Sequence, residues 1–208
     1  HSRIDETVEK VTASARVGNI YVNRNMIGAV VGVQPFGGEG LSGTGPKAGG
    51  PLYLHRMAGS ERVPPGMLGV RRGTALADGS PAFHRLAAWA AASGRHDLAQ
   101  LCADYAALTL RHALIDLPGP TGERNTLGFA ALGRLLCLAP DDSSLLRQLA
   151  AVLAVDGQAV MPKDETSRAV LRILPPDLAA AIELQPQEDY ADLAGVLLAG
   201  DAGLATAL

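Results

Sequence analysis

Aromatic side chains, cysteine and net charge are all scarce in this chain. Aromatic residues make up 4% of its 208 residues, it has two cysteines, and its formal net charge is −3. With a pI near 5.9, the chain has no basic footprint, which argues against a nucleic-acid partner. No apolar run approaches the ~20 residues that a transmembrane segment needs. The hydrophobic fraction of 48% still suffices for a core, built mostly of alanine, leucine and valine.

The two cysteines, Cys102 and Cys137, lie in apolar surroundings without the spacing of metal ligands. We interpret both as reduced core thiols of a cytoplasmic protein. Charged residues from Arg3 to Lys10 predict a helix at the start of the chain rather than a signal peptide. The chain has no initiator methionine and stops inside an apparent helix, so we expect it to be a piece of a longer polypeptide.

The first part of the chain is predicted to contain a helix, two strands and a glycine-rich loop. Apolar residues at helical spacing predict a helix over residues 4–15. Short apolar runs predict strands over residues 20–23 and 29–33. In residues 37–50, glycines alternate with small polar residues, which lets backbone N–H groups approach a ligand closely.

A stretch rich in proline, glycine and arginine predicts a linker over residues 58–80, between domains at 1–57 and 81–208. His112 lies on a helical apolar stripe of the second domain, which favours a core histidine over a ligand. From residue 133 onward strands alternate with helices, which predicts a partial Rossmann-like parallel sheet and an α/β fold, incomplete at its C-terminus. The expected helices span residues 81–93, 96–117, 143–154, 165–173 and 176–182, and the expected strands span 134–139, 158–161 and 193–198.

Two blocks of sequence carry the most specific signal. They are GNIYVNRN at residues 18–25 and QPFGG at residues 34–38, which leads into the glycine-rich loop. In this register they resemble the C-terminal end of the aldehyde dehydrogenase superfamily. Within it they are most similar to the glutamate-semialdehyde (pyrroline-5-carboxylate) dehydrogenases.

The resemblance implies a substrate anchor. In the family, backbone N–H groups of the turn that matches Gly28 and Ala29 hold the carboxylate of L-glutamate γ-semialdehyde, as consecutive N–H groups in a tight turn suit an anion. Phe36 matches an aromatic that packs on the substrate's aliphatic carbons. Without the resemblance, Gly28 could equally lie in an ordinary turn and Phe36 could be an ordinary core aromatic. Ala29 replaces a residue that often has a hydroxyl in the family, which removes one hydrogen bond worth ~1 kcal/mol.

Four polar residues flank the loop: Asn23, Arg24, Gln34 and Ser42. We expect them to fix its conformation through hydrogen bonds to backbone, and we expect Lys47 to be a solvated charge. The family's catalytic cysteine and glutamate lie upstream of such a segment. No catalytic residue is therefore expected here, and no cofactor is expected to bind this chain alone.

The resemblance also implies a parent protein. That parent is a bifunctional bacterial enzyme of proline catabolism, which oxidises proline with FAD and then the semialdehyde with NAD. Its implied partners are L-glutamate γ-semialdehyde and the upstream dehydrogenase and flavin domains of the same polypeptide, in a homo-oligomer. We expect it in the cytoplasm, with a peripheral contact to the inner membrane left open.

The second domain resembles, more weakly, the first βαβ unit of an aldehyde dehydrogenase NAD domain. The runs LLCLAP at 135–140 and AVMPK at 159–163 place Lys163 where the family has a lysine on the adenosine ribose, and GDAG at 200–203 falls near its nucleotide-side glycines. However, Asp141 and Asp142 replace an aromatic–asparagine pair, and no G-x-G-x-x-G motif is present.

This pattern favours the non-catalytic accessory domain of the longer bifunctional enzymes, a structural lid over the path between their two active sites. A nucleotide-binding module with Lys163 on a ribose is the alternative. A third interpretation is a purely structural, alanine-rich helical scaffold.

Overall fold

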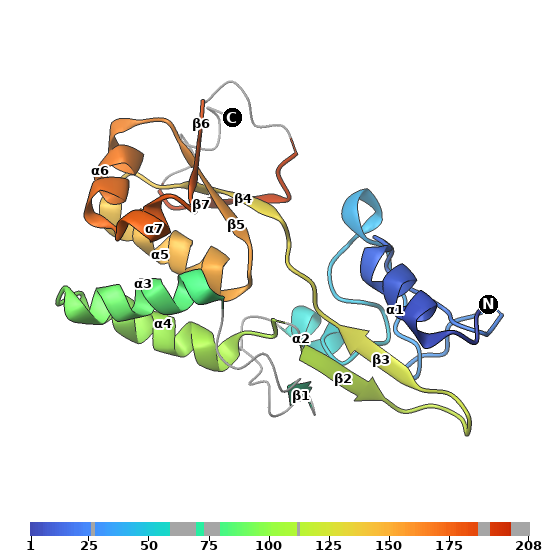
Figure 1. Cartoon of the computed structure of the whole chain (residues 1–208). Coiled ribbons are helices and arrows are strands. Elements are labelled where there is room, and N and C mark those ends of the chain that lie inside the picture. The colour runs from blue at the N-terminus through green and yellow to red at the C-terminus, as the bar shows by residue number, and fades with distance from the viewer. Residues whose placement is uncertain (26–27, 59–69, 73–79, 112, 187–191, 201–208) are drawn as a thin grey trace. The chain divides into compact units, whose positions relative to one another are not determined.

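The computed structural model describes residues 1–25, 28–58, 70–72, 80–111, 113–186 and 192–200. The chain forms two compact units, each drawn from two stretches of sequence (Figure 1). The first unit comprises His1–Arg71 and Leu114–Leu127, and the second comprises Arg72–Ala113 and Gly128–Leu208. Residues 114–127 thus group with the first unit, whereas the sequence placed them in the second domain. Most of the predicted linker lies outside the described residues.

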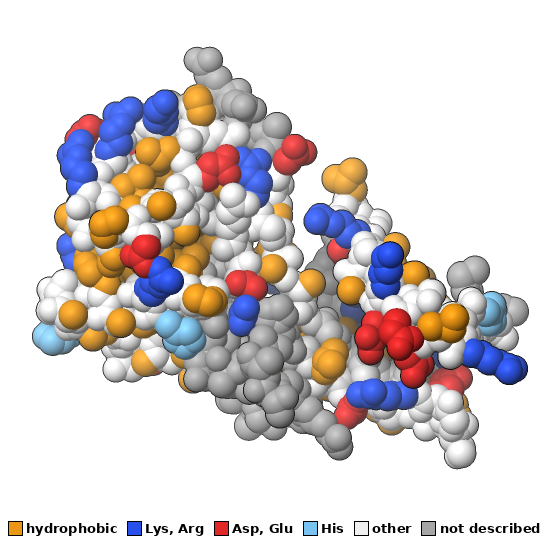
Figure 2. All heavy atoms as spheres, viewed as in Figure 1, with side chains coloured by type: hydrophobic (Ala, Val, Ile, Leu, Met, Phe, Trp, Pro, Cys, Tyr) orange, Lys and Arg blue, Asp and Glu red, His pale blue; other side chains and the backbone are white. Residues whose placement is uncertain are grey.

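The first part of the structure has little regular secondary structure. Helix α1 confirms the predicted first helix, but none of its residues is buried. Hydrophobic side chains are visible across the surface of the first unit in Figure 2, and Val31 and Leu54 are among the exposed ones. The elements are α1 (Asp5–Ser14), the 3-10 helix η1 (Gly40–Ser42), α2 (Tyr53–Ala58), and the strands β1 (Val70–Arg72), β2 (Ala113–Leu117) and β3 (Asn125–Gly128), which form a sheet in the order β1-β2-β3.

The strands predicted over residues 20–23 and 29–33 are wrong. Residues 30–34 instead form a turn, in which the backbone N–H of Gln34 donates to the carbonyl of Val30 at 2.8 Å. Gly32 has a φ of +77°, a left-handed conformation that interrupts an extended run. A strand needs a neighbour to pair its backbone groups, and no described strand pairs with either segment.

The second unit is built on a parallel sheet in the order β6-β5-β4-β7. Counted along the chain this order is 3-2-1-4, which is the strand order of a Rossmann fold. The predicted parallel sheet is therefore confirmed. The strands are β4 (Arg134–Leu138), β5 (Gln158–Pro162), β6 (Glu183–Gln185) and β7 (Gly195–Leu198), and the helices are α3 (Pro81–Ala92), α4 (His96–Leu108), α5 (Asp142–Ala154), α6 (Glu165–Ile173) and α7 (Pro176–Ala179).

Apolar side chains of α5 form the centre of the second unit's core, and Leu145 and Leu149 are fully buried. Helices α3 and α4 pack on α5. The start of α3 is fixed to α5 by Ser80, whose hydroxyl accepts from the N–H of Phe83 at 3.1 Å and donates to the carbonyl of Leu153 at 3.2 Å. Among the described residues, no helix is long and apolar enough to cross a bilayer.

The single helix predicted over residues 96–117 is wrong in its second half. Helix α4 ends at Leu108, where Thr109 becomes extended and its hydroxyl donates to the carbonyl of Ala154 at 2.8 Å. The chain then enters β2, along which burial alternates with period two. His112, expected on the apolar stripe, lies outside the described residues, as do residues 201–203 of the GDAG run.

Candidate functional site

The turn at Gly28 and Ala29 presents two consecutive backbone N–H groups. Both residues are exposed, and Gly28 has a φ of +66°. Within the described chain neither N–H donates a hydrogen bond, and a Cβ added to Gly28 would meet no atom within 4 Å. Adjacent unpaired N–H groups of this kind can receive an anion such as a carboxylate. We refer to Gly28 and Ala29 as the anchor turn.

Gln34 holds the backbone that follows the anchor turn. Its side chain is buried, and its Oε1 accepts from the N–H of Val30 at 3.0 Å. Its Nε2 donates to the carboxylate of Glu123 at 3.1 Å. The N–H of Val30 is therefore already used, which leaves those of Gly28 and Ala29 for a ligand. Sequence reasoning missed Glu123, because nothing in the linear pattern links residues that lie 89 positions apart.

Phe36 is 56% exposed, so it is not a core aromatic of this chain. Its backbone pairs with Ala48 through two hydrogen bonds of 3.0 Å and 2.9 Å, which form an isolated antiparallel bridge. The bridge closes the glycine-rich loop at its base. The ring is left available to contact an apolar group of a ligand.

Lys47 is not the solvated charge that the sequence predicted. Its side chain folds back into the glycine-rich loop, where Nζ donates to the carbonyls of Gly37 at 3.2 Å and Gly38 at 2.5 Å. Asn19 fixes the same loop from the other direction. Its amide donates to the carbonyl of Pro35 at 2.8 Å, and its Oδ1 accepts from the N–H of Gly37 at 3.1 Å. The sequence does not reveal this contact, because no sequence pattern shows that a loop lysine bonds carbonyls nine and ten positions earlier in the same loop.

Three further predicted residues lie in different places. Asn23 exchanges two hydrogen bonds with the backbone of Ser2, at 2.9 Å and 2.7 Å. Ser42 donates to the carbonyl of Glu39 at 3.0 Å, inside η1 and its cap. Arg24 bonds no backbone group of the described residues and instead reaches the carboxylate of Glu123 at 3.3 Å. The structure thus brings Arg24 and Gln34 together on Glu123, and it leaves Asn23 and Ser42 as separate local supports.

The N-terminus of α5 lies at the carboxyl edge of the parallel sheet, where a Rossmann fold receives a phosphate. Here the carboxylate of Asp141 takes that position. It accepts from the backbone N–H of Ser144 and from the Ser144 hydroxyl, both at 2.9 Å. These hydrogen bonds, the backbone one first, lower the pKa of Asp141. A charged carboxylate there would repel a pyrophosphate, so the residues present do not fit NAD.

Lys163 follows β5 at the same edge of the sheet. Its backbone N–H donates to the carbonyl of Gln185 at 2.9 Å, and its side chain is exposed, with no hydrogen bond or ion pair to a described residue. A hollow of about 270 Å³ lies against the end of β7 and the first turns of α5. It is lined by Tyr105, Ser144, Arg147, Gln148, Ala151 and residues 197–199.

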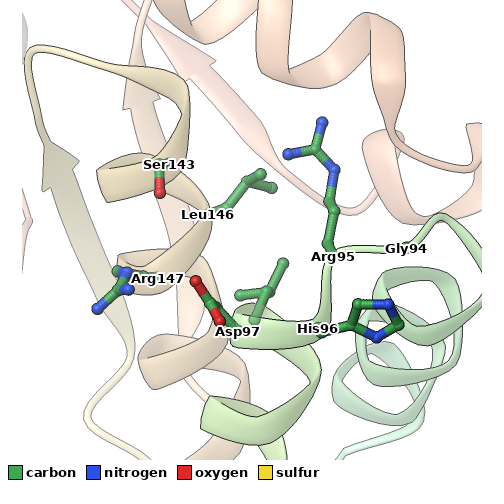
Figure 3. A pocket seen from close by; sticks show the side chains of 8 residues that line it. Gly94, Arg95, His96, Asp97, Ser143, Leu146 and Arg147 are labelled. Atoms are coloured by element: carbon green, nitrogen blue, oxygen red, sulfur yellow. The ribbon is translucent and has the colours of Figure 1, made fainter.

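A larger hollow of about 390 Å³ lies between the first turns of α4 and α5 (Figure 3). Arg95, which precedes α4, lines it together with His96 and Asp97 of α4, and Ser143, Leu146 and Arg147 line it from α5. The guanidinium of Arg95 lies 5.1 Å from the centre of the Trp89 ring. Asp97 offsets one of the positive charges. The hollow therefore has mixed charge and no clear preference for one kind of ion.

Neither cysteine is a candidate nucleophile. Cys102 and Cys137 are buried, free thiols, which confirms their prediction as core residues. Burial raises the pKa of Cys102 to about 11 and that of Cys137 to about 12. Both are protonated at neutral pH, whereas a nucleophilic cysteine acts as the thiolate.

Comparison with known proteins relates the first part of the chain to a family and most of the chain to larger proteins. Residues 1–63 match the aldehyde dehydrogenase family. The bifunctional protein PutA of Escherichia coli K12 is 47% identical over 197 residues, which are 91% of this chain and 15% of that protein. The chain is homologous to a segment of PutA. PutA of Rhizobium meliloti is 40% identical over 205 residues, covering 97% of this chain and 16% of the relative.

A second group of relatives is similar over a shorter stretch. The 1-pyrroline-5-carboxylate dehydrogenase of Bacillus thuringiensis is 57% identical over 47 residues, which are 23% of this chain and 9% of that enzyme. The predicted fold class, an aldehyde dehydrogenase fragment followed by a Rossmann-like parallel sheet, is confirmed. The chain spans about 15% of the length of the E. coli and Salmonella typhimurium PutA proteins.

Proposed function

We propose that the first unit is the substrate anchor of an NAD-dependent L-glutamate γ-semialdehyde dehydrogenase, within a bifunctional enzyme that also oxidises proline with FAD. The observation that carries this proposal is the anchor turn, whose two N–H groups are exposed and unpaired in the described chain. Similarity to proteins named PutA and 1-pyrroline-5-carboxylate dehydrogenase supports the substrate class. The semialdehyde carries a carboxylate at the end remote from its reacting aldehyde, which is the group the turn would hold.

The chain's own residues bind and orient in this proposal, and they perform no bond-making step. The N–H groups of Gly28 and Ala29 donate to the carboxylate, and the ring of Phe36 contacts the aliphatic carbons. Holding the remote end supplies binding energy that lowers KM for the semialdehyde. The thiol nucleophile and both cofactors belong to the parts of the parent upstream of this segment.

Steady-state kinetics of the full-length enzyme test the anchor. Gly28→Val adds a side chain at a positive φ and crowds the two N–H groups. We expect it to raise KM for the semialdehyde roughly tenfold, the cost of about one hydrogen bond to a charged group. A carboxylate-free aldehyde such as butanal should be oxidised as before. Gly40→Val is the matched control, because Gly40 has a φ of +61° and equally open surroundings. An unchanged KM in Gly28→Val would remove the assignment.

We further propose that the second unit is a non-catalytic lid over the path between the two active sites. It has the Rossmann strand order, yet the carboxylate of Asp141 fills the phosphate position. With proline and NAD supplied, the full-length enzyme should form NADH without delay, and an enzyme lacking the second unit but retaining residues 114–127 should show a lag before NADH appears. No lag in that variant would contradict the lid.

The alternative is a nucleotide-binding module, favoured by the exposed Lys163 at the carboxyl edge of the sheet. Calorimetric titration of the 208-residue chain with NAD separates the two interpretations. We expect no binding heat at micromolar concentrations. A micromolar dissociation constant that Lys163→Ala abolishes would establish the module instead. A purely structural scaffold predicts neither the lag nor the heat.

A further inference from the structure

Glu123 lies in the connection between β2 and β3, which forms the tip of a hairpin in Figure 1. The tip has defined geometry. The backbone N–H of Glu123 donates to the carbonyl of Pro120 at 3.1 Å, and Gly122 takes a φ of +89° to make the turn. Asn125 closes the base by donating from its amide to the carbonyl of Pro118 at 3.4 Å. The hairpin therefore presents the carboxylate from a fixed backbone.

One oxygen of that carboxylate receives both contacts from the anchor region. Oε2 accepts from Nε2 of Gln34 at 3.1 Å and from Nη1 of Arg24 at 3.3 Å. The two charged side chains are partly shielded from solvent, at 25% side-chain exposure for Arg24 and 29% for Glu123. Arg24 is also held by Tyr21, whose ring centre lies 5.6 Å from the guanidinium carbon. Charge-assisted hydrogen bonds of limited exposure are stronger than neutral ones.

The contact determines which way the Gln34 amide faces. A glutamine amide has one acceptor end and one donor end. With Nε2 drawn to Glu123, Oε1 faces the N–H of Val30, which directly follows the anchor turn. That N–H belongs to the peptide group between Ala29 and Val30. The hydrogen bond therefore fixes the orientation of this peptide plane, which is adjacent to the peptide group that carries the unpaired N–H of Ala29. Without the carboxylate, the donor end of a buried amide is left unpaired.

We infer that Glu123 is a positioning residue for substrate binding, acting through Gln34 on the anchor turn. A hairpin from a distant part of the sequence thereby sets the affinity for the substrate carboxylate. The inference rests on the proposed anchoring of the semialdehyde. It adds that Glu123, which touches no substrate, controls the Michaelis constant and not the chemical step.

The test uses the full-length enzyme with Glu123→Ala and Glu123→Gln. For Glu123→Ala we expect KM for the semialdehyde to rise roughly tenfold, with kcat and the KM for NAD unchanged. Glu123→Gln keeps an oxygen that can accept from Gln34 but loses the charge that Arg24 pairs with, so KM should rise by less, about threefold. Oxidation of butanal should change in neither variant. Glu9→Ala, which removes an exposed carboxylate of α1, is the control.

The outcomes separate this inference from the proposed function. Equal losses with the semialdehyde and butanal, together with a lower melting temperature, would mean a merely structural role and overturn the inference. An unchanged KM in Glu123→Ala, beside a raised KM in Gly28→Val, would overturn the inference and leave the anchor intact. An unchanged KM in both variants would remove both. If Glu123→Ala does not fold, the selective rise of KM in Glu123→Gln decides the question.

Discussion

The two units of this chain are maintained by different interactions. In the first unit, side chains such as Asn19, Gln34 and Lys47 hydrogen-bond to loop backbone, while many large apolar side chains stay exposed. In the second unit, a sheet and its helices bury a continuous apolar core. The comparison shows that polar contacts hold the loops of the first unit, whereas an apolar core stabilises the second unit.

The largest expected effect comes from the core. Leu149 is fully buried in α5, so Leu149→Ala should lower the free energy of unfolding of the second unit by about 2–5 kcal/mol. Urea unfolding followed by circular dichroism measures it. Leu41 is fully exposed in the first unit, and Leu41→Ala should change the free energy of unfolding of the first unit by less than about 0.5 kcal/mol. Comparable losses in the two variants would erase the distinction between the units.

A smaller effect is expected where polar contacts dominate. Lys47→Met removes the donor to the carbonyls of Gly37 and Gly38 and should destabilise the closed loop by about 1–3 kcal/mol. Hydrogen exchange at the N–H of Gly37, which is bonded to Asn19, should accelerate, while the core of α5 keeps its protection. Lys10→Met, a change at an exposed lysine of α1, is the control and should leave exchange unaltered.

The smallest effect concerns acid stability. Hydrogen bonds from Ser144 lower the pKa of Asp141 below its ordinary value of 3.8. A lowered pKa in the folded state means stability that is present above that value and is lost as the pH falls through the folded pKa. Asp141→Asn should remove this acid-dependent loss, as measured by melting temperatures between about pH 5 and about pH 2. Asp142→Asn should leave the acid-dependent loss of stability in place. Equal behaviour of the two variants would contradict the role of Asp141 as the N-terminal cap of α5.

The sequence was sufficient where periodicity and burial agree. Residues 134–173 alternate between apolar strands and amphipathic helices, and the structure confirms each of those elements within a residue or two. It was insufficient where one apolar pattern suits two structures. Residues 29–33 have strand composition but form a turn, because Gly32 and the Gln34 side chain take over the backbone bonding. β6 has only three residues, too few to show a period.

The sequence predicted which residues form the candidate site, but it did not predict the hydrogen bonds that join them to other residues. Motif resemblance identified Gly28, Ala29 and Gln34, whose substrate-related roles stay predictions. It could not show that Gln34 bonds Glu123, because that contact depends on how a hairpin 89 positions away folds back. Nor could it show Lys47 bonding its own loop, since a lysine among glycines is usually exposed to water.

The chain passes from the first unit to the second and back before entering the second for good, because residues 114–127 return to the first unit. Neither unit is consequently encoded by one continuous stretch of the gene. A stop codon between residues 72 and 113 would remove the hairpin, and Glu123 with it, whereas a stop codon after residue 127 would leave both in place. Swapping the second unit between homologues while keeping residues 114–127 therefore needs three crossovers rather than one.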